Sequence, residues 1–94
     1  MNKIEEIAWA LAVTDDHAAI SDFLKSLLTQ SEIKEISSRW ELVKLLESGM
    51  SQRKISRQLG LSLCKITRGS KELKKKPSSF RKMIDTYKRL EEAQ

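Results

Sequence analysis

The stretch Met50–Gly69, MSQRKISRQLGLSLCKITRG, constrains the fold of this chain more than any other segment. Ser51 is a preferred N-cap residue, and its hydroxyl can accept a free backbone N–H in the first turn of a helix that runs to about Gln58. Gly60 stands where the chain must leave this helix with positive φ, which glycine adopts at little steric cost. Ser62 is a second N-cap candidate. The stretch therefore predicts two short helices joined by a tight glycine turn.

The apolar residues of this stretch recur at helical spacing. Ile55 and Leu59 are four residues apart, so they share one face of the first helix and can pack against a core. Leu63 and Ile66 are expected to face inward from the second helix, and Leu61 to fill the angle between the helices. The other positions carry many positive charges. This layout is typical of a helix-turn-helix, which inserts its second helix into the DNA major groove. An ordinary helical hairpin with a solvated basic face is the alternative.

Charge is distributed unevenly between the two halves of the chain. Residues 1–49 hold five Lys or Arg and nine Asp or Glu, a net charge of −4. Residues 50–94 hold thirteen and four, a net charge of +9, and the two halves sum to +5. A basic half beside an acidic half predicts a localised surface for a polyanion, with nucleic acid the best candidate. An anionic membrane is the weaker candidate, because no long apolar segment is visible.

Residues that usually carry chemistry are sparse. Cys64 is the only cysteine and His17 the only histidine, so neither an intrachain disulfide nor a zinc set is expected. The sequence shows no paired carboxylates and no nucleophile–base constellation, so we expect no enzyme activity, metal or cofactor. The N-terminal segment is acidic and lacks a clean apolar core. It therefore indicates no signal peptide and predicts a cytoplasmic protein.

Helical periodicity covers most of the chain, which has only three glycines and one proline. Thr29 and Glu32 form a Thr-x-x-Glu capping box for a helix that runs to about Glu47, and Gly49 suits its C-cap. Pro77 suits the first turn of a last helix. The expected helices are residues 3–13, 18–28, 29–47, 51–58, 62–70 and 77–90. The sequence thus predicts one all-α domain over 1–94, with about six helices and a helix-turn-helix at about 51–70.

Residues 18–28 and 80–90 carry apolar side chains on more than one side. A single central helix in a chain of this length cannot cover that much apolar surface. An intertwined homodimer, with residues 3–47 and 78–90 at its interface, would bury the surplus. A two-fold dimer would also set two recognition helices about one helical turn of DNA apart. A compact monomer is the alternative.

The segment GMSQRKISRQLGLSLCKITRGSKELKKKP resembles the tryptophan repressor family. The likeness rests on the Met-Ser-Gln-Arg opening, the Leu-Gly turn, the Ile-Thr-Arg-Gly-Ser close, and the Leu-Lys and proline that follow. Upstream, a leucine-rich run ending at Thr29 and an arginine ten residues later also match, so the resemblance covers about residues 18–90. It implies an all-helical, intertwined homodimer. Such a dimer would bind L-tryptophan as corepressor and then bind operator double-stranded DNA, as a sequence-specific transcriptional repressor of tryptophan-related genes.

The resemblance also implies a ligand site. Arg39 and Arg68 match two arginines that sandwich the indole, and a planar guanidinium can stack on an aromatic face or pair with a carboxylate. Thr29 matches a threonine that contacts the ligand from the other subunit. The other matching positions are Ser26 and Leu28 for backbone carbonyls, Leu42 and Val43 for the apolar wall, and Gly69 where the indole packs on backbone. Glu72 departs from the family, which often has serine there. Its carboxylate would either repel the carboxylate of the ligand or accept a hydrogen bond from the indole N–H.

The residues expected to contact DNA are spread over both helices of the helix-turn-helix. Arg53 is the expected base reader, because arginine binds guanine O6 and N7 in a bidentate manner. Leu63 and Cys64 are near the start of the second helix, where apolar contact with a thymine methyl or water-mediated readout is possible. The other expected contacts are Ser56, Ser62, Lys65, Thr67 and Lys71. A basic run is expected to hold phosphates rather than bases, with a solvated loop as the alternative: Lys71, Lys74, Lys75 and Lys76.

Two alternatives to a tryptophan-responsive repressor stay open. A helix-turn-helix regulator of the same fold could bind DNA without a ligand or with a different one. Glu72, and a turn before Met50 that is one residue shorter than in the family, favour this alternative. A helical interaction protein could instead bind an acidic protein or a membrane through its basic half.

Overall fold

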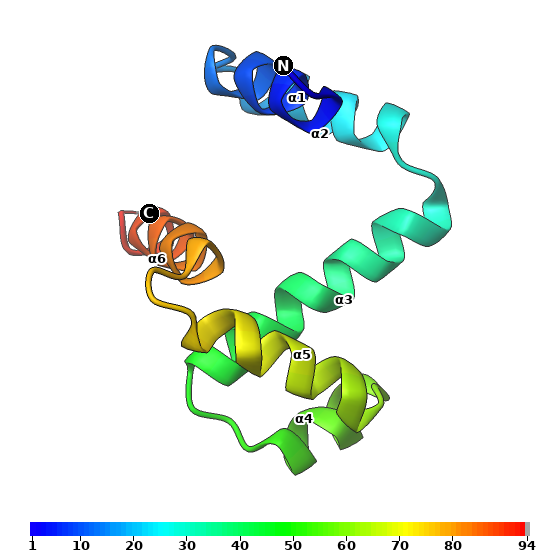
Figure 1. The fold of residues 1–94 in the computed structure, drawn as a ribbon, viewed down its shortest axis with the longest axis vertical. Helices are drawn as coiled ribbons and strands as arrows, with labels where there is room; N and C mark the ends of the chain where they lie inside the picture. The colour runs from blue at the N-terminus through cyan, green and yellow to red at the C-terminus, as the bar shows by residue number, and fades with distance from the viewer. Residues whose placement is uncertain (94) are drawn as a thin grey trace. The chain divides into compact units, whose positions relative to one another are not determined.

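The computed structural model describes residues 1–93 and consists of helices joined by short turns (Figure 1). The helices of this part of the chain are α1 (Lys3–Ala12), α2 (His17–Leu27), α3 (Gln30–Glu47), α4 (Gln52–Leu59), α5 (Leu63–Lys74) and α6 (Ser79–Glu92). No β-strand occurs among residues 1–93, which confirms the prediction of an all-α chain with about six helices. In the same residues, no helix is both long and apolar enough to cross a membrane.

Polar side chains determine where the helices begin. The predicted capping box is present, since the Thr29 N–H donates to Glu32 Oε1 at 2.8 Å and the Glu32 N–H donates to Thr29 Oγ1 at 3.1 Å. Ser51 and Ser62 are the N-caps of α4 and α5, as their residue type predicted. Each of these side chains binds a backbone N–H that has no partner inside the helix.

The chain divides into two compact units, Met1–Glu35 and Ile36–Gln94. The first unit holds α1, α2 and the beginning of α3. Neither α1 nor α2 contains a buried residue. The large apolar side chains that this unit exposes include Ile4, Trp9, Val13, Phe23, Leu24 and Leu27. The first unit therefore carries apolar surface that its own helices do not cover. The assignment of 1–94 to one domain stays a prediction.

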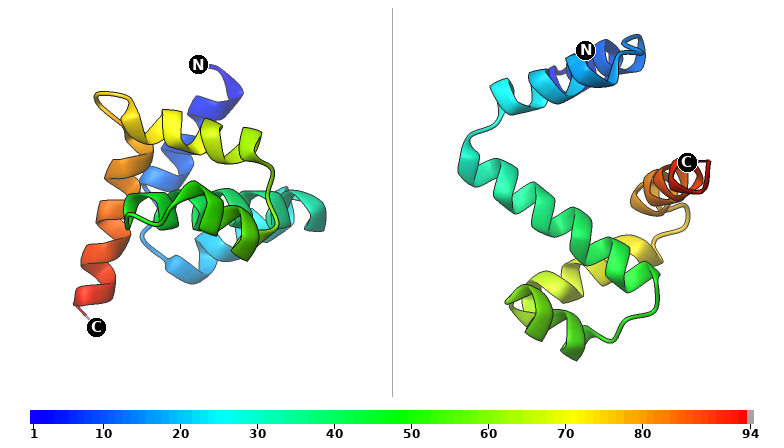
Figure 2. Two further views of the ribbon diagram at one scale, coloured as in Figure 1. Left: turned by 90° about the horizontal axis from the view of Figure 1, so that it is seen from below. Right: turned by 180° about the vertical axis from the view of Figure 1, so that it is seen from behind.

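The second unit has two small hydrophobic cores that are built on adjacent residues of α3. Leu42 packs with Ile55 of α4 and Ile66 of α5. Val43 packs with Leu73 of α5 and Ile84 of α6. Adjacent residues of a helix face different directions, so α3 serves both cores. Figures 1 and 2 show α5 crossing the C-terminal turns of α3, with α4 beside it.

Aromatic and ionic contacts hold α6 against α3. The ring of Trp40 stacks on Phe80 with centroids 5.9 Å apart and meets the edge of Tyr87 at 6.0 Å. Trp40 thus packs against the core. The Lys88 ammonium donates a hydrogen bond to the Glu47 carboxylate, which joins the far ends of the same two helices.

The corner between α5 and α6 depends on Ser78. The Ser78 Oγ accepts the Arg81 N–H at 3.1 Å as the N-cap of α6, and it donates to the Glu72 carbonyl at 2.8 Å. The prediction that Pro77 occupies the first turn of the last helix is wrong, because Pro77 precedes the N-cap and α6 begins only at Ser79. One hydroxyl therefore links the end of α5 to the start of α6.

Candidate nucleic-acid interface and ligand site

The helices α4 and α5 pack against each other around the turn 60–62. Gly60 has φ +67°, the left-handed conformation predicted for the end of α4. Ile55 and Ile66 are 0% exposed, and Leu61 packs against the core that they form, which confirms its predicted place between the helices. The angle between α4 and α5 is therefore fixed by buried apolar side chains and a glycine turn.

The helix α5 has one buried and one exposed side. Ile66, Gly69 and Leu73 are its buried residues. The exposed residues include the expected DNA contacts Leu63, Cys64, Lys65, Thr67 and Lys71. The expectation that Leu63 faces inward is wrong, because this side chain is 61% exposed. Leu63 is the first residue of α5, and the buried stripe begins one turn later at Ile66. The exposed side thus offers cations, a thiol, a hydroxyl and one apolar side chain.

The three remaining expected DNA contacts differ in what their side chains already do. Arg53 is exposed on α4. The Ser62 Oγ accepts the Lys65 N–H at 3.4 Å, so its lone pair caps α5 while its O–H can still donate. The Ser56 Oγ donates to the Leu61 carbonyl at 2.9 Å, which uses its proton inside the turn. The structure gives Ser56 a role in shaping the helix-turn-helix, and its DNA contact stays a prediction.

The apolar residues of the expected ligand site lie where α3 meets α5 and α6. A Cβ on Gly69 would lie 3.2 Å from Leu42 Cδ2 and 3.4 Å from Leu46 Cδ1, so the absence of a side chain at residue 69 favours the close approach of these helices. Leu42 and Val43 are 2% and 1% exposed and belong to the two cores. In this structure all three residues are covered by the chain itself, and their contact with a ligand stays a prediction.

The charged residues of the expected ligand site are accessible beside that packing. Arg39 is exposed on α3, and Arg68 is exposed on α5 directly before Gly69. Glu72 lies four residues after Arg68, which places both on one side of α5. The Glu72 carboxylate binds the Lys75 ammonium at 2.8 Å, so a neighbouring cation balances its charge.

The last three expected ligand residues lie at the end of α2 and the turn into α3, within the first unit. The Ser26 Oγ donates to the Asp22 carbonyl at 3.0 Å, Leu28 is the C-cap of α2, and Thr29 belongs to the capping box of α3. These contacts are local. The resemblance to the family implies that the ligand binds the backbone carbonyls of Ser26 and Leu28. That assignment stays a prediction.

Sequence reasoning missed two cationic residues that the fold brings to the basic run. Arg81 and Lys82, from the first turns of α6, line one pocket together with Lys74, Lys75 and Lys76. Arg81 and Lys82 follow the lysine run closely in the sequence, just across the turn between α5 and α6. This short spacing could have indicated that the fold brings them together. Within residues 1–93, no group of three or more His, Cys, Asp and Glu side chains is placed to hold a metal ion.

A buried scaffold, a left-handed glycine turn and an exposed basic second helix together define a helix-turn-helix protein of the DNA-binding class. The Trp repressor protein family matches residues 2–88. The chain belongs to this family, whose members are DNA-binding transcriptional repressors and not enzymes. The resemblance inferred from the sequence is confirmed.

Several relatives are named Trp operon repressor homologs. One from Chlamydia trachomatis serovar D is 31% identical over 90 residues, which span 89% of this chain and 96% of the relative. One from Vibrio campbellii is 38% identical over 64 residues, which span 67% of this chain and 64% of the relative. One from Vibrio vulnificus is 46% identical over 54 residues, which span 56% of this chain and 53% of the relative. No solved structure matches the chain at a significant level.

Proposed function

We propose that this protein is a cytoplasmic homodimeric repressor that binds operator DNA when L-tryptophan is bound as corepressor, and so controls tryptophan-related genes. The observation that carries the proposal is the place of Arg68 on α5. Arg68 is exposed, it follows the expected DNA contact Thr67, and it precedes Gly69, which packs on α3. A ligand at Arg68 would therefore act on the helix that reads DNA and on the contact that orients it.

The chemistry of the ligand site suits an amino acid with an aromatic ring. The guanidinium groups of Arg39 and Arg68 offer planar faces for an indole and donors for a carboxylate. The carbonyls of Ser26 and Leu28 and the hydroxyl of Thr29, supplied by the other subunit, would accept from the ammonium group. Leu42, Val43 and Gly69 would form the apolar side of the site, where the ligand displaces part of the packing between α3 and α5. Tryptophan would then stabilise one orientation of α5, as a ligand that binds one conformational state more tightly shifts the equilibrium toward that state.

DNA recognition would use the exposed side of α5 and the start of α4. Arg53 would read a guanine, while Leu63 and Cys64 would meet base edges from the first turn of α5. Ser62, Lys65, Thr67 and Lys71 would contribute further contacts, mainly to the phosphate backbone that positions the helix. Ser56 would support these contacts through the turn.

The test is operator affinity with and without L-tryptophan. Operators are first selected from a random duplex pool, and binding is then titrated in both conditions. We expect tryptophan to raise the affinity at least about tenfold, within the usual range of coupling between two sites. Arg68→Ala should make the operator affinities with and without L-tryptophan equal. The matched control Arg57→Ala, an exposed cation of α4, should lower both affinities equally and preserve the ratio. Equal affinities for the unmodified protein in both conditions would overturn the corepressor role.

A second candidate is a regulator of the same fold that needs no ligand or uses another one. The pairing of Glu72 with Lys75 beside Arg68 favours it, because a second charged pair next to the site changes which ligand carboxylates and amines can bind. Calorimetry with L-tryptophan, tryptamine and indole-3-propionate separates the two candidates. Heat of binding for tryptophan alone supports the first, and binding of only an analogue, or of none, supports the second.

A further inference from the structure

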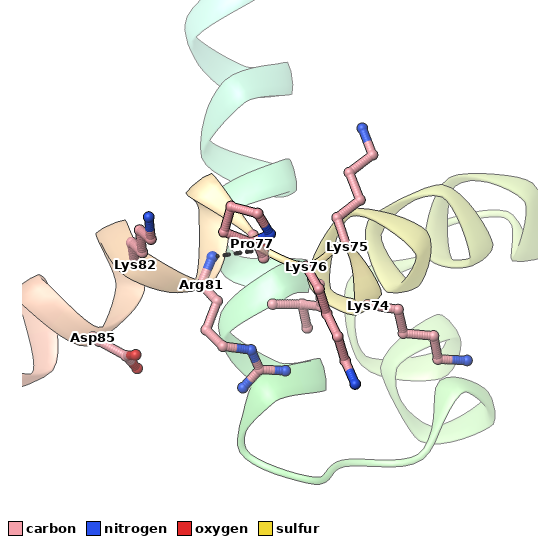
Figure 3. A pocket seen from close by; sticks show the side chains of 9 residues that line it. Lys74, Lys75, Lys76, Pro77, Arg81, Lys82 and Asp85 are labelled. Carbon is pink, nitrogen blue, oxygen red and sulfur yellow. Dashed lines mark hydrogen bonds between the residues drawn. The ribbon is translucent and has the colours of Figure 1, made fainter.

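A pocket at the corner where α5 ends and α6 begins is lined mainly by cations. Its volume is about 650 Å³. The charged residues that line this corner pocket are Lys74, Lys75, Lys76, Arg81, Lys82 and Asp85 (Figure 3). Five cationic residues and one carboxylate thus line one pocket, although they come from two helices and the turn between them, and the ends of Lys75 and Lys82 extend away from the side to which Lys76 and Arg81 point.

Most of these cations are not balanced by the protein. Lys75 binds Glu72 at 2.8 Å. Within the described residues, no ion pair within 4 Å occupies the charged groups of Lys74, Lys76, Arg81 or Lys82, and Asp85 is the one carboxylate that lines the pocket. Concentrated charge of one sign in a concavity attracts a counter-charge, so this surface favours an anion.

The donors of the corner pocket suit a phosphate group. Figure 3 shows the ends of the Lys76 and Arg81 side chains extending toward the same side of the pocket. A guanidinium presents two parallel N–H donors to two oxygens of one phosphate, and an ammonium supplies a third charged donor. The 14-residue helix α6 also begins at Ser79, next to the lining residue Ser78, and its N-terminal end adds a favourable field for negative charge.

The corner pocket is separate from the first turns of α5, where Leu63 and Cys64 are expected to meet base edges, although the expected contact Lys71 lies only three residues before Lys74. Leu63 begins α5 and Lys74 ends it. Eleven residues separate these positions, which corresponds to about 17 Å along an α-helix. An anion in the pocket therefore does not occupy the surface formed by the first turns of α5.

We propose that the corner pocket binds a phosphate group, with Lys76 and Arg81 as its principal donors. The phosphate belongs either to the DNA backbone outside the helix-turn-helix contact or to a free phosphorylated molecule. The proposal does not rest on tryptophan or on an operator, so it can be tested in their absence.

The experiment compares three forms of the full chain. The pocket variant is Lys76→Gln/Arg81→Gln, and the charge-matched control is Lys25→Gln/Lys34→Gln, which removes two exposed cations of the first unit. All four positions are exposed, so both variants should fold, as circular dichroism will verify. Tripolyphosphate is titrated by calorimetry. Binding of a short random-sequence duplex is measured over a range of salt concentrations.

We expect the pocket variant to lose at least tenfold in tripolyphosphate affinity or about one unit of the salt slope for duplex binding, since both side chains bind one phosphate and each lost phosphate contact lowers that slope by about one. A reduced salt slope identifies the DNA backbone as the source of the phosphate. A loss of tripolyphosphate affinity with an unchanged slope identifies a free phosphorylated molecule. The proposal is overturned if the pocket variant and the control behave alike in both measurements.

Discussion

At the scale of single residues, Gly60 shows how one backbone conformation shapes the helix-turn-helix. Its φ is +67°, and a Cβ there would meet no atom within 4 Å. The cost of Gly60→Ala is thus conformational: about 1–2 kcal/mol for the left-handed region, against about 0.4–1 kcal/mol gained from a less flexible unfolded chain. We expect the free energy of unfolding to fall by about 1 kcal/mol on urea denaturation. Gly60→Asn is the control and should lose less, because asparagine tolerates this conformation. Equal losses would contradict this explanation.

Gly69 is needed for a different reason, namely the close approach of α5 to α3. For Gly69→Ala, helix propensity gains about 1 kcal/mol, and the new methyl meets Leu42 Cδ2 at 3.2 Å. We expect these effects to cancel to within about 1 kcal/mol. Gly69→Val overfills the same space and should lower the free energy of unfolding by about 1–3 kcal/mol. Lys71→Val, on the exposed side of α5, measures the propensity cost of valine alone. If both valine variants unfold at the same urea concentration, residue 69 does not limit the packing.

At the scale of elements, Ser78 joins two helices through one hydroxyl. It is 6% exposed, and it binds both the Arg81 N–H and the Glu72 carbonyl. Ser78→Ala removes a cap worth about 1 kcal/mol and leaves a carbonyl near the α5 end without its partner, which adds about 1 kcal/mol or more. Ser51→Ala is the matched control, because that exposed serine only caps α4. We expect a loss of about 2 kcal/mol for Ser78→Ala and about 1 kcal/mol for Ser51→Ala in thermal and urea unfolding. Similar losses would show that the bridge to α5 contributes nothing.

The elements that could be predicted from the sequence are those that depend on local chemistry. The capping box of Thr29 and Glu32, the Ser51 and Ser62 caps and the turn at Gly60 each need only residues close in the chain, and all are present. The places where the prediction failed depend on contacts between helices. Pro77 fits a first helical turn by type, but the hydrogen bond from Ser78 to α5 moves the start of α6 beyond it.

The same distinction between local chemistry and contacts between helices applies to the candidate functional site. The exposed cations of α5 could be assigned from periodicity, because the opposite stripe of Ile66, Gly69 and Leu73 is regular. The burial of Leu42 and Val43 in two separate cores, and the gathering of Arg81 with the lysine run, require the positions of α3 and α6 in space. A residue's spacing along one helix does not contain that information.

At the scale of the whole molecule, the exposed apolar surface of α1 and α2 predicts a homodimer. Phe23 and Leu27, one turn apart on α2, are 39% and 49% exposed, and no residue of either helix is buried. A chain of this size gains stability by burying such a face against a second copy. We therefore expect a mass near twice 10.8 kDa in analytical ultracentrifugation.

The variant Phe23→Asp/Leu27→Asp should shift that mass toward 10.8 kDa. It places two charges in the expected interface, where burying an unpaired charge is strongly unfavourable. Operator binding should weaken at least about tenfold, because two recognition helices no longer engage two half-sites together. Lys25→Asp on the same helix is the control, since it changes the net charge by the same −2 at an exposed polar position. It should leave the dimer intact. If the unmodified protein has the mass of one chain at every concentration, the dimer is contradicted. If the double variant still forms the dimer, the interface does not include this face of α2.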